Sequence, residues 1–159
     1  MSRPLTEGEV ALARTVFGET IDYGQVRLST RWWGWAAIVF GSAVTFPPSY
    51  PAPPDFTLET PQLQSWLIHE LTHVWQFQTR PAWTVASWAM TAARGGYRRG
   101  LPGYRYGWPL KPWARHNLEQ QAAMVEHAFM LRQIGRCGAA PAGARFEDYC
   151  AAVPFDLRP

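Results

Sequence analysis

The 159-residue sequence predicts an α+β fold, in which helices pack on a small antiparallel sheet. Two segments, 6–20 and 60–80, carry apolar residues at the three- and four-residue spacing of an amphipathic helix. Two others, 26–29 and 36–46, are rich in Val, Ile, Phe and Thr, as strands are. With 47% hydrophobic and 17% charged residues, the composition is that of an ordinary globular protein. The length suffices for one domain with a sizeable core, so we expect residues 1–159 to form a single domain.

Residues 6–20 are expected to form the first helix. Val10 and Phe17 belong to its apolar face, Thr6 is a suitable N-cap, and Gly18 marks its end. This start lacks the basic and apolar regions of a secretory signal, which favours a cytoplasmic location and leaves export by a specialised secretion system as an alternative.

The strand-like residues come next. Gly41 and Ser42 lie between two apolar runs of the 36–46 stretch, so this stretch is expected to turn there as a hairpin. The whole apolar region 32–46 is interrupted by Gly and Ser and is too short to span a bilayer. We therefore expect no stable membrane insertion. A proline-rich stretch, 47–54, then forms either a stiff connector or a cover for part of a cleft.

The segment 60–80 is a well-delimited helix that contains the pentad HELTH at residues 69–73. Thr60 is a suitable N-cap, Pro61 suits the first helical position, and Pro81 closes the segment. On a helix, two histidines four residues apart share one face, so their rings can converge on one metal ion.

His69 and His73 are accordingly candidate zinc ligands, because Zn²⁺ is commonly bound by neutral imidazole. Glu70 lies beside them and could accept a proton from a water activated by the metal. The alternatives are that both histidines are core or surface residues, or that they form a closed structural zinc site without catalysis.

A catalytic zinc site needs a third protein ligand. The arrangement with a third His six residues after the second is excluded, since Thr79 occupies that position. A second helix is expected from its N-cap Asn117 to a stop at Gly135, with Glu119 in its first turn. We favour Glu119 as the third ligand, while Glu126, seven residues later on nearly the same face, is either its competitor or a partner of a ligand histidine.

Between these two helices, 83–94 is expected to be a further apolar helix, and 97–116 has neither helical nor strand periodicity. A loop of that length is usually functional or mobile, which makes it a candidate lid. It offers donors for the oxyanion of a tetrahedral intermediate, either a tyrosine hydroxyl or an imidazole, although each could instead serve packing. The candidates are Tyr104, Tyr106 and His116.

Arginines are concentrated in the same region, although the net charge is only +3. Such a cluster indicates an acidic partner or a membrane surface, but a solvated loop is the more common reason for it. Recognition of nucleic acid is not expected, because no basic stripe or known nucleic-acid module accompanies the cluster. The arginines are Arg94, Arg98, Arg99, Arg105 and Arg115.

The two-helix pattern, with HELTH on one helix and Glu-x-x-Ala at 119–122 on the other, resembles the gluzincin-like zinc metallopeptidases, particularly their compact minimal members. Three stretches look more specifically like the short bacterial Vgr-related proteins and the related toxin-associated metallopeptidase domain. They are 5–9 with 22–27, 69–76 and 117–122.

This resemblance implies a minimal zincin-like fold with His69, His73 and Glu119 as zinc ligands and Glu70 as the general base. It also implies that an edge strand beside the motif helix pairs with the substrate backbone, for which 43–46 is the candidate. Enzymes of this kind often have an Asp four residues after the third ligand, where this chain has Ala123. Support for the ligands must then come from elsewhere.

The predicted function is hydrolysis of peptide bonds by a zinc-dependent metallopeptidase, with a peptide or protein as substrate. The alternative is an inactive or latent zinc-binding accessory module, such as an adaptor in a bacterial secretion or toxin system. A secretion-system or toxin component is a further candidate partner, and burial of the metal beneath 97–116 would favour a latent enzyme.

Overall fold

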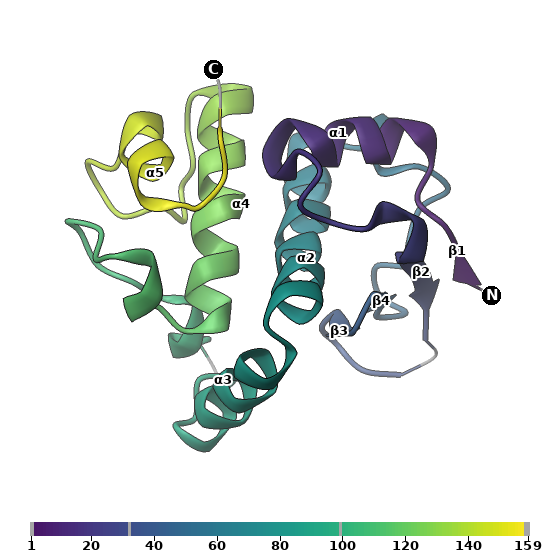
Figure 1. The fold of residues 1–159 in the computed structure, drawn as a ribbon, viewed down its shortest axis with the longest axis horizontal. Coiled ribbons are helices and arrows are strands. Elements are labelled where there is room, and N and C mark those ends of the chain that lie inside the picture. Colours follow the sequence, from purple (N-terminus) through teal and green to yellow (C-terminus); the bar gives the residue numbers. More distant parts are fainter. Residues whose placement is uncertain (1, 32, 99, 158–159) are drawn as a thin grey trace.

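The computed structural model describes residues 2–31, 33–98 and 100–157, so Arg99 of the arginine cluster and residue 32 of the predicted apolar region lie outside the described residues. The architecture is α+β, as predicted, with helices packed against a small sheet (Figure 1). The helices are α1 (Glu7–Phe17), α2 (Pro61–Thr79), α3 (Pro81–Ala93), α4 (Leu118–Ile134) and α5 (Phe146–Ala152), and the strands are β1 (Ser2–Arg3), β2 (Arg27–Thr30), β3 (Ile38–Phe40) and β4 (Ala43–Phe46).

The helix ends follow the capping residues of the sequence. The side chains of Thr6, Thr60 and Asn117 each accept a hydrogen bond from a backbone N–H in the first turn of α1, α2 and α4, respectively. Gly135 ends α4 in the left-handed conformation, with φ of 68°, which a residue with a Cβ rarely adopts. The helices that carry the candidate site are thus fixed by local chemistry at their ends.

The strand order is β1-β2-β4-β3. The predicted turn at Gly41 and Ser42 is confirmed, since β3 and β4 pair antiparallel on either side of it. The expectation of a wholly antiparallel sheet was wrong, because β2 and β4 are parallel. After β2 the chain passes to the outer position, forms β3 there, and returns through the hairpin, so that β4 enters beside β2 in the same direction.

This topology also corrects the predicted edge strand. The candidate residues 43–46 form β4, which lies between β2 and β3, and its Val44 and Phe46 are fully buried. The outer position beside β4 belongs to β3. Phe40 of β3 lies 5.7 Å from Phe77 of α2, measured between ring centroids, so the edge strand packs beside the motif helix as expected.

Helix α2 occupies the centre of the fold. Figure 1 shows it between α4 and the layer formed by α1 and the sheet, and it contacts all three. Its apolar residues Leu67, Ile68 and Leu71 are fully buried for this reason. None of the described helices is both long enough and apolar enough to cross a membrane. Helix α5, which the sequence pattern did not predict, packs on α4 and buries Tyr149.

Candidate metal centre

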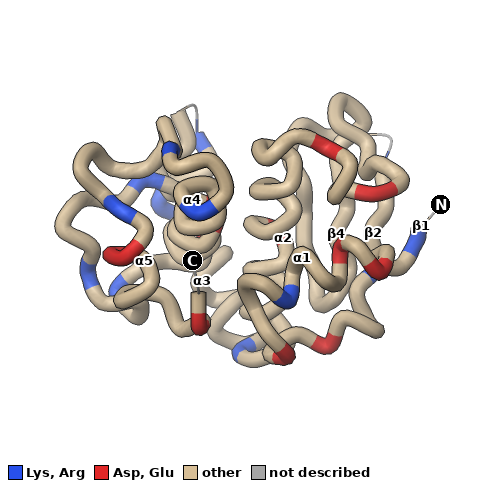
Figure 2. Tube along the Cα trace, turned by 90° about the horizontal axis from the view of Figure 1, so that it is seen from above, with Lys and Arg blue, Asp and Glu red and all other residues tan. Residues whose placement is uncertain are grey.

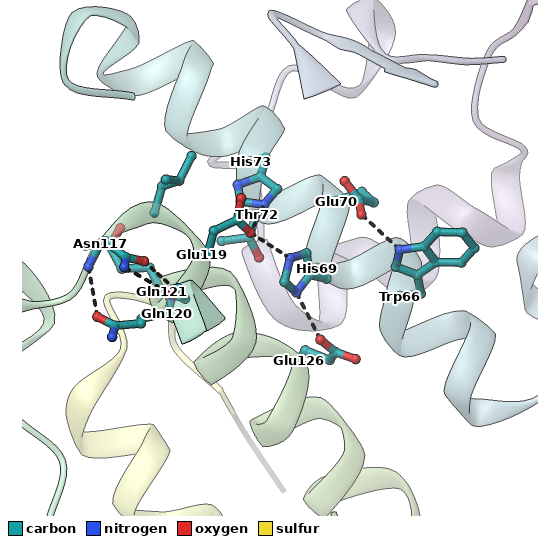
Figure 3. A network of polar contacts seen from close by, with 12 residues as sticks. Trp66, His69, Glu70, Thr72, His73, Asn117, Glu119, Gln120, Gln121 and Glu126 are labelled. Atoms are coloured by element: carbon teal, nitrogen blue, oxygen red, sulfur yellow. Dashed lines mark hydrogen bonds and ion pairs between the residues drawn. The ribbon is translucent and has the colours of Figure 1, made fainter. Parts of the chain in front are cut away.

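Three side chains from α2 and α4 converge. His69 and His73 lie one helical turn apart on α2, and Glu119 reaches them from the first turn of α4 (Figure 3). The candidate ligand atoms of the three residues all lie within 4.8 Å of one another. The helices can approach closely because Ala122 and Ala123, which follow Glu119 on α4, are small and buried.

The orientation of both imidazole rings is fixed from outside the group. The Nε2 atoms of His73 and His69 lie 3.2 Å and 3.5 Å from Oε2 of Glu119. The opposite ring nitrogens are held elsewhere: Nδ1 of His69 lies 2.9 Å from Oε2 of Glu126, and Nδ1 of His73 lies 2.8 Å from Oε1 of Gln76. Each Nδ1–H can therefore be donated to an oxygen, which leaves both Nε2 lone pairs directed at the centre of the group.

Gln76 connects this arrangement to the start of α4. Its Nε2 donates to the carbonyl oxygen of Leu118 and to Oε1 of Gln121, both at 3.1 Å. Because the side chain is fully buried, each of these bonds is made away from water. The ring of His73 and the helix that carries Glu119 are thus positioned by the same amide group.

The donor set fits a divalent metal ion. Two imidazole nitrogens and one carboxylate oxygen are ligands that Zn²⁺ accepts, and the same set also suits other divalent ions. The three residues are nearly buried, with exposures of 5–7%. The structure thus brings together the three residues that the sequence proposed as ligands, and Glu126 contacts the outer nitrogen of His69 instead of belonging to the three converging side chains.

The electrostatics of the group favour a cation. Burial alone would lower the pKa of His69, but its hydrogen bonds to Glu119 and Glu126 outweigh burial and raise the pKa well above its ordinary value. For His73, the charge of Glu119 and the hydrogen bond to it likewise outweigh burial and raise the pKa. Burial would raise the pKa of Glu119, but the two histidines hold it well below its usual range. The group thus attracts positive charge, whether a proton or a metal ion.

Glu70 lies on the neighbouring face of α2. Its side chain is buried, and its Oε1 accepts a hydrogen bond of 2.9 Å from the indole N–H of Trp66, one turn earlier (Figure 3). Burial raises the pKa of this carboxyl group above its ordinary value, against the opposing charges of His69 and His73. A raised pKa makes the carboxylate a better proton acceptor, as a general base requires.

Two tyrosines of the segment 97–116 contact members of the group. The hydroxyl of Tyr97 donates to Oε1 of Glu119 at 2.6 Å. The ring of Tyr104 stacks on His69, with centroids 5.7 Å apart and planes 19° apart. Burial and the charge of Glu119 raise the pKa of both hydroxyls, so each remains a hydrogen-bond donor at neutral pH.

The other two predicted oxyanion donors occupy a different set of contacts. The hydroxyl of Tyr106 is hydrogen-bonded to Nδ1 of His127 and, at 2.9 Å, to the hydroxyl of Tyr149. The ring of His116 packs edge-on against Tyr106, and its Nε2 lies 3.2 Å from the carbonyl oxygen of Lys111. Among the described residues, these contacts do not include a member of the His69, His73 and Glu119 group.

Comparison with known proteins places the chain in a family. Among solved structures, it is similar to the effector domain of Pseudomonas aeruginosa VgrG2b, with a TM-score of 0.70 and 31% sequence identity over 95% of this chain and 83% of that chain. The chain belongs to the VgrG2b effector-domain family. It is also 34% identical, over 152 residues, to the type VI secretion system spike protein VgrG2b of the same organism. That match covers 91% of the chain and only 14% of the spike protein, and no protein-family model matches the chain.

In this member of the VgrG2b effector-domain family, sequence reasoning missed three contacts of the site. Trp66 lies four residues before Glu70, and Gln76 lies three residues after His73, so helical spacing alone could have identified both. Tyr97 had no comparable signal, because the aperiodic segment that carries it offers no rule for which of its tyrosines turns inward.

Proposed function

We propose that this VgrG2b-related chain is a zinc-dependent peptidase in which His69, His73 and Glu119 hold the metal. The observation that supports this most strongly is the orientation of the two imidazoles. Glu126 and Gln76 fix the outer nitrogens, and both inner nitrogens face Glu119. A site organised in this way from two helices has the form expected of a metal centre with supported ligands.

In the proposed reaction, the bound metal, Glu70 and Trp66 have separate roles. A zinc ion bound in this site would supply Lewis acidity, which activates water and polarises the scissile carbonyl. Glu70 accepts the proton of the attacking water at a carboxylate oxygen and returns it to the leaving amine. Trp66 holds the carboxylate through its indole N–H while this occurs.

A further donor is needed for the negative charge that develops on the carbonyl oxygen of the substrate. Tyr104 is the best-placed candidate, because its ring lies against His69 and its hydroxyl stays protonated. Tyr106 and His116, which the sequence also suggested, could serve only if the segment 97–116 moved and their present hydrogen bonds broke.

For substrate binding, we propose that an extended peptide adds to the outer edge of β3. This strand packs on α2, which carries the HELTH pentad, and it holds the outer position of the sheet that the sequence assigned to β4. Pairing would use the backbone groups of Ile38–Phe40, while the exposed Ile38 and Phe40 would contact substrate side chains.

The setting that we propose is a secretion system. VgrG2b, to which the chain is similar, is a spike protein of a type VI secretion system, and its solved domain is described as an effector domain. We infer that this chain is exported as an enzymatic effector and acts on a peptide or protein target of the recipient. The spike apparatus would be its partner during export.

A comparison of wild type with Glu70→Gln tests the enzyme directly. Both proteins, matched for zinc content, are assayed against a peptide library, with Glu7→Gln as an exposed control. We expect a loss of at least about a thousandfold in turnover for Glu70→Gln, because the base is removed while the ligands remain. If wild type cleaves nothing and zinc removal unfolds the protein, the chain is a zinc-stabilised adaptor instead.

One observation favours a second candidate, a latent peptidase. Tyr97 contacts Glu119 and Tyr104 contacts His69, and all three candidate ligands are only 5–7% exposed. If the segment 97–116 restricts access, Tyr97→Phe should increase turnover of a short peptide, since the hydroxyl would no longer hold the segment on Glu119. An unchanged or lower rate identifies an enzyme that is already accessible.

A further inference from the structure

Helix α3 has its polar and apolar faces reversed. Its fully or largely buried residues are Thr84 and Thr91, whereas Val85, Trp88 and Met90 are 49%, 55% and 51% exposed. The remaining exposed positions of this 13-residue helix are Pro81 and alanines. A surface helix ordinarily turns its apolar face to the core, so this outward apolar face indicates contact with something other than water.

Positive charge is concentrated in the part of the sequence that follows the same helix. Between Glu70 and Glu119 the sequence has no Asp or Glu. Five basic side chains of this stretch are exposed, and within the part of the chain that the structure describes none of them forms an ion pair with a carboxylate. They are Arg94, Arg98, Arg105, Lys111 and Arg115. Figure 2 shows that acidic residues are concentrated instead on the half of the molecule that contains α1, β2 and β4.

A cavity of about 550 Å³ lies between α3 and the start of α4. Trp83 and Met90 of α3 form its apolar wall, and Arg94 and Arg115 bring guanidinium groups to it. Asp and Glu are absent from the described residues that line it. An anionic group of modest size would find two guanidinium donors here beside an apolar surface.

We propose that α3 and this basic cavity form a docking surface for anionic phospholipid. Val85, Trp88 and Met90 would enter the boundary between headgroups and acyl chains, with α3 lying in the plane of the membrane. Arg94 and Arg115 would bind headgroup phosphate in the cavity. This inference goes beyond the proposed peptidase function and does not depend on it.

The chemistry favours a lipid surface over two other occupants. A bilayer interface accepts Val, Met and Trp side chains together with neighbouring arginines, whereas single-stranded nucleic acid is held by aromatic faces in a basic groove. A symmetric contact with a second copy would bring the arginines of both copies together, and they would repel each other. At 13 residues, α3 is too short to span a bilayer, which is consistent with a helix that lies on the surface.

Cosedimentation with vesicles tests the proposal. The zinc-loaded wild type is mixed with vesicles of 30% phosphatidylglycerol in phosphatidylcholine, or of phosphatidylcholine alone. Two variants address the two parts of the surface, Trp88→Asp for the apolar face and the double variant Arg94→Glu and Arg115→Glu for the cavity. The matched controls are Leu58→Asp, at a side chain that is 85% exposed in another part of the fold, and the double variant Arg27→Glu and Arg136→Glu, at two exposed positions, which changes the net charge by the same amount as the cavity variant.

We expect wild type and both controls to bind the anionic vesicles at least about tenfold more strongly than neutral vesicles, and each test variant to lose at least about tenfold. Circular dichroism confirms that the variants remain folded. Three results would overturn the proposal: no binding by wild type, equal losses in tests and controls, or binding that survives Trp88→Asp. It would also be overturned if the test variants abolished a dimer in solution, or binding of a single-stranded oligonucleotide, and left vesicle binding unchanged.

Discussion

Two tyrosine–histidine clusters join the segment 97–116 to the rest of the protein, and they differ in charge. In the first, Tyr97 and Tyr104 contact Glu119 and His69. In the second, Tyr106 is hydrogen-bonded to His127 of α4 and to Tyr149 of α5. The two histidines are almost equally buried, at 5% and 6% exposure.

Their pKa values nevertheless move in opposite directions. Two carboxylate hydrogen bonds outweigh burial and raise the pKa of His69 well above its ordinary value. Burial dominates at His127 and lowers its pKa to about 4, because the nearby charge of Glu126 is not joined to it by a hydrogen bond among the described residues. The carboxylate partner, and not burial, therefore makes the first cluster suitable for a cation and the second a neutral anchor.

The largest difference between the clusters should be in metal content. In Glu119→Ala, zinc per chain should fall from near one to near zero, because the carboxylate ligand is lost. His127→Gln should keep the zinc content of wild type, since it changes only the neutral cluster. Elemental analysis of protein purified without added metal measures both. Retention of zinc in Glu119→Ala, with loss in Glu126→Ala, would assign the third ligand to Glu126.

The pH dependence of stability should separate the clusters next. His127 has a folded-state pKa of about 4, below its ordinary value of 6.5, so the unfolded chain takes up a proton first as the pH falls. This group should therefore cost about 3 kcal/mol of unfolding free energy between pH 7 and pH 4. Urea unfolding at both pH values measures this cost. Between pH 7 and pH 4, His127→Gln should lose about 3 kcal/mol less unfolding free energy than wild type does. Parallel losses in the two proteins would contradict a neutral buried His127.

Glu126 holds the outer nitrogen of His69 in the first cluster. Its replacement should weaken zinc binding less than the loss of Glu119 does. In Glu126→Gln the charged partner of Nδ1 of His69 becomes neutral, so zinc affinity should fall by roughly 10- to 100-fold while the ligand set survives. Competition with a chromogenic chelator measures this affinity. Glu147→Gln, an exposed position on α5, is the control, and equal affinities in all three proteins would remove the supporting role of Glu126.

The smallest expected effect concerns the hydroxyl of Tyr106. Tyr106→Phe removes hydrogen bonds to His127 and Tyr149 and should lower the unfolding free energy by about 1 to 2 kcal/mol, with no change in zinc affinity. Tyr97→Phe, in contrast, should change the zinc affinity, because the hydrogen-bond partner of Tyr97 is Glu119. If Tyr106→Phe weakened zinc binding as much as Tyr97→Phe, the two clusters would not be separate.

Local chemistry made much of the fold predictable. Thr60 and Asn117 cap their helices through short-range hydrogen bonds, and the turn at Gly41 depends on a few neighbouring residues, so all three were visible in the sequence. The parallel pairing of β2 with β4 could not be predicted from the sequence, because it depends on the route that the chain takes between the strands. The mistaken assignment of the edge to residues 43–46 has the same origin.

In the candidate site, too, some residues could be predicted from the sequence and others could not. The four-residue spacing of His69 and His73 fixes their geometry on any helix, and small residues after Glu119 indicated a close helix contact. The choice among Tyr97, Tyr104 and Tyr106 depends on how an aperiodic segment folds over α4, which residue spacing cannot predict.

X-ray absorption at the zinc edge tests the central claim most directly. For the zinc-loaded wild type, we expect two imidazole nitrogens and a carboxylate oxygen in the first coordination shell, at about 2.0 to 2.2 Å. Ligation by sulfur at about 2.3 Å, or a shell with fewer than two imidazoles, would contradict a metal centre built from His69, His73 and Glu119.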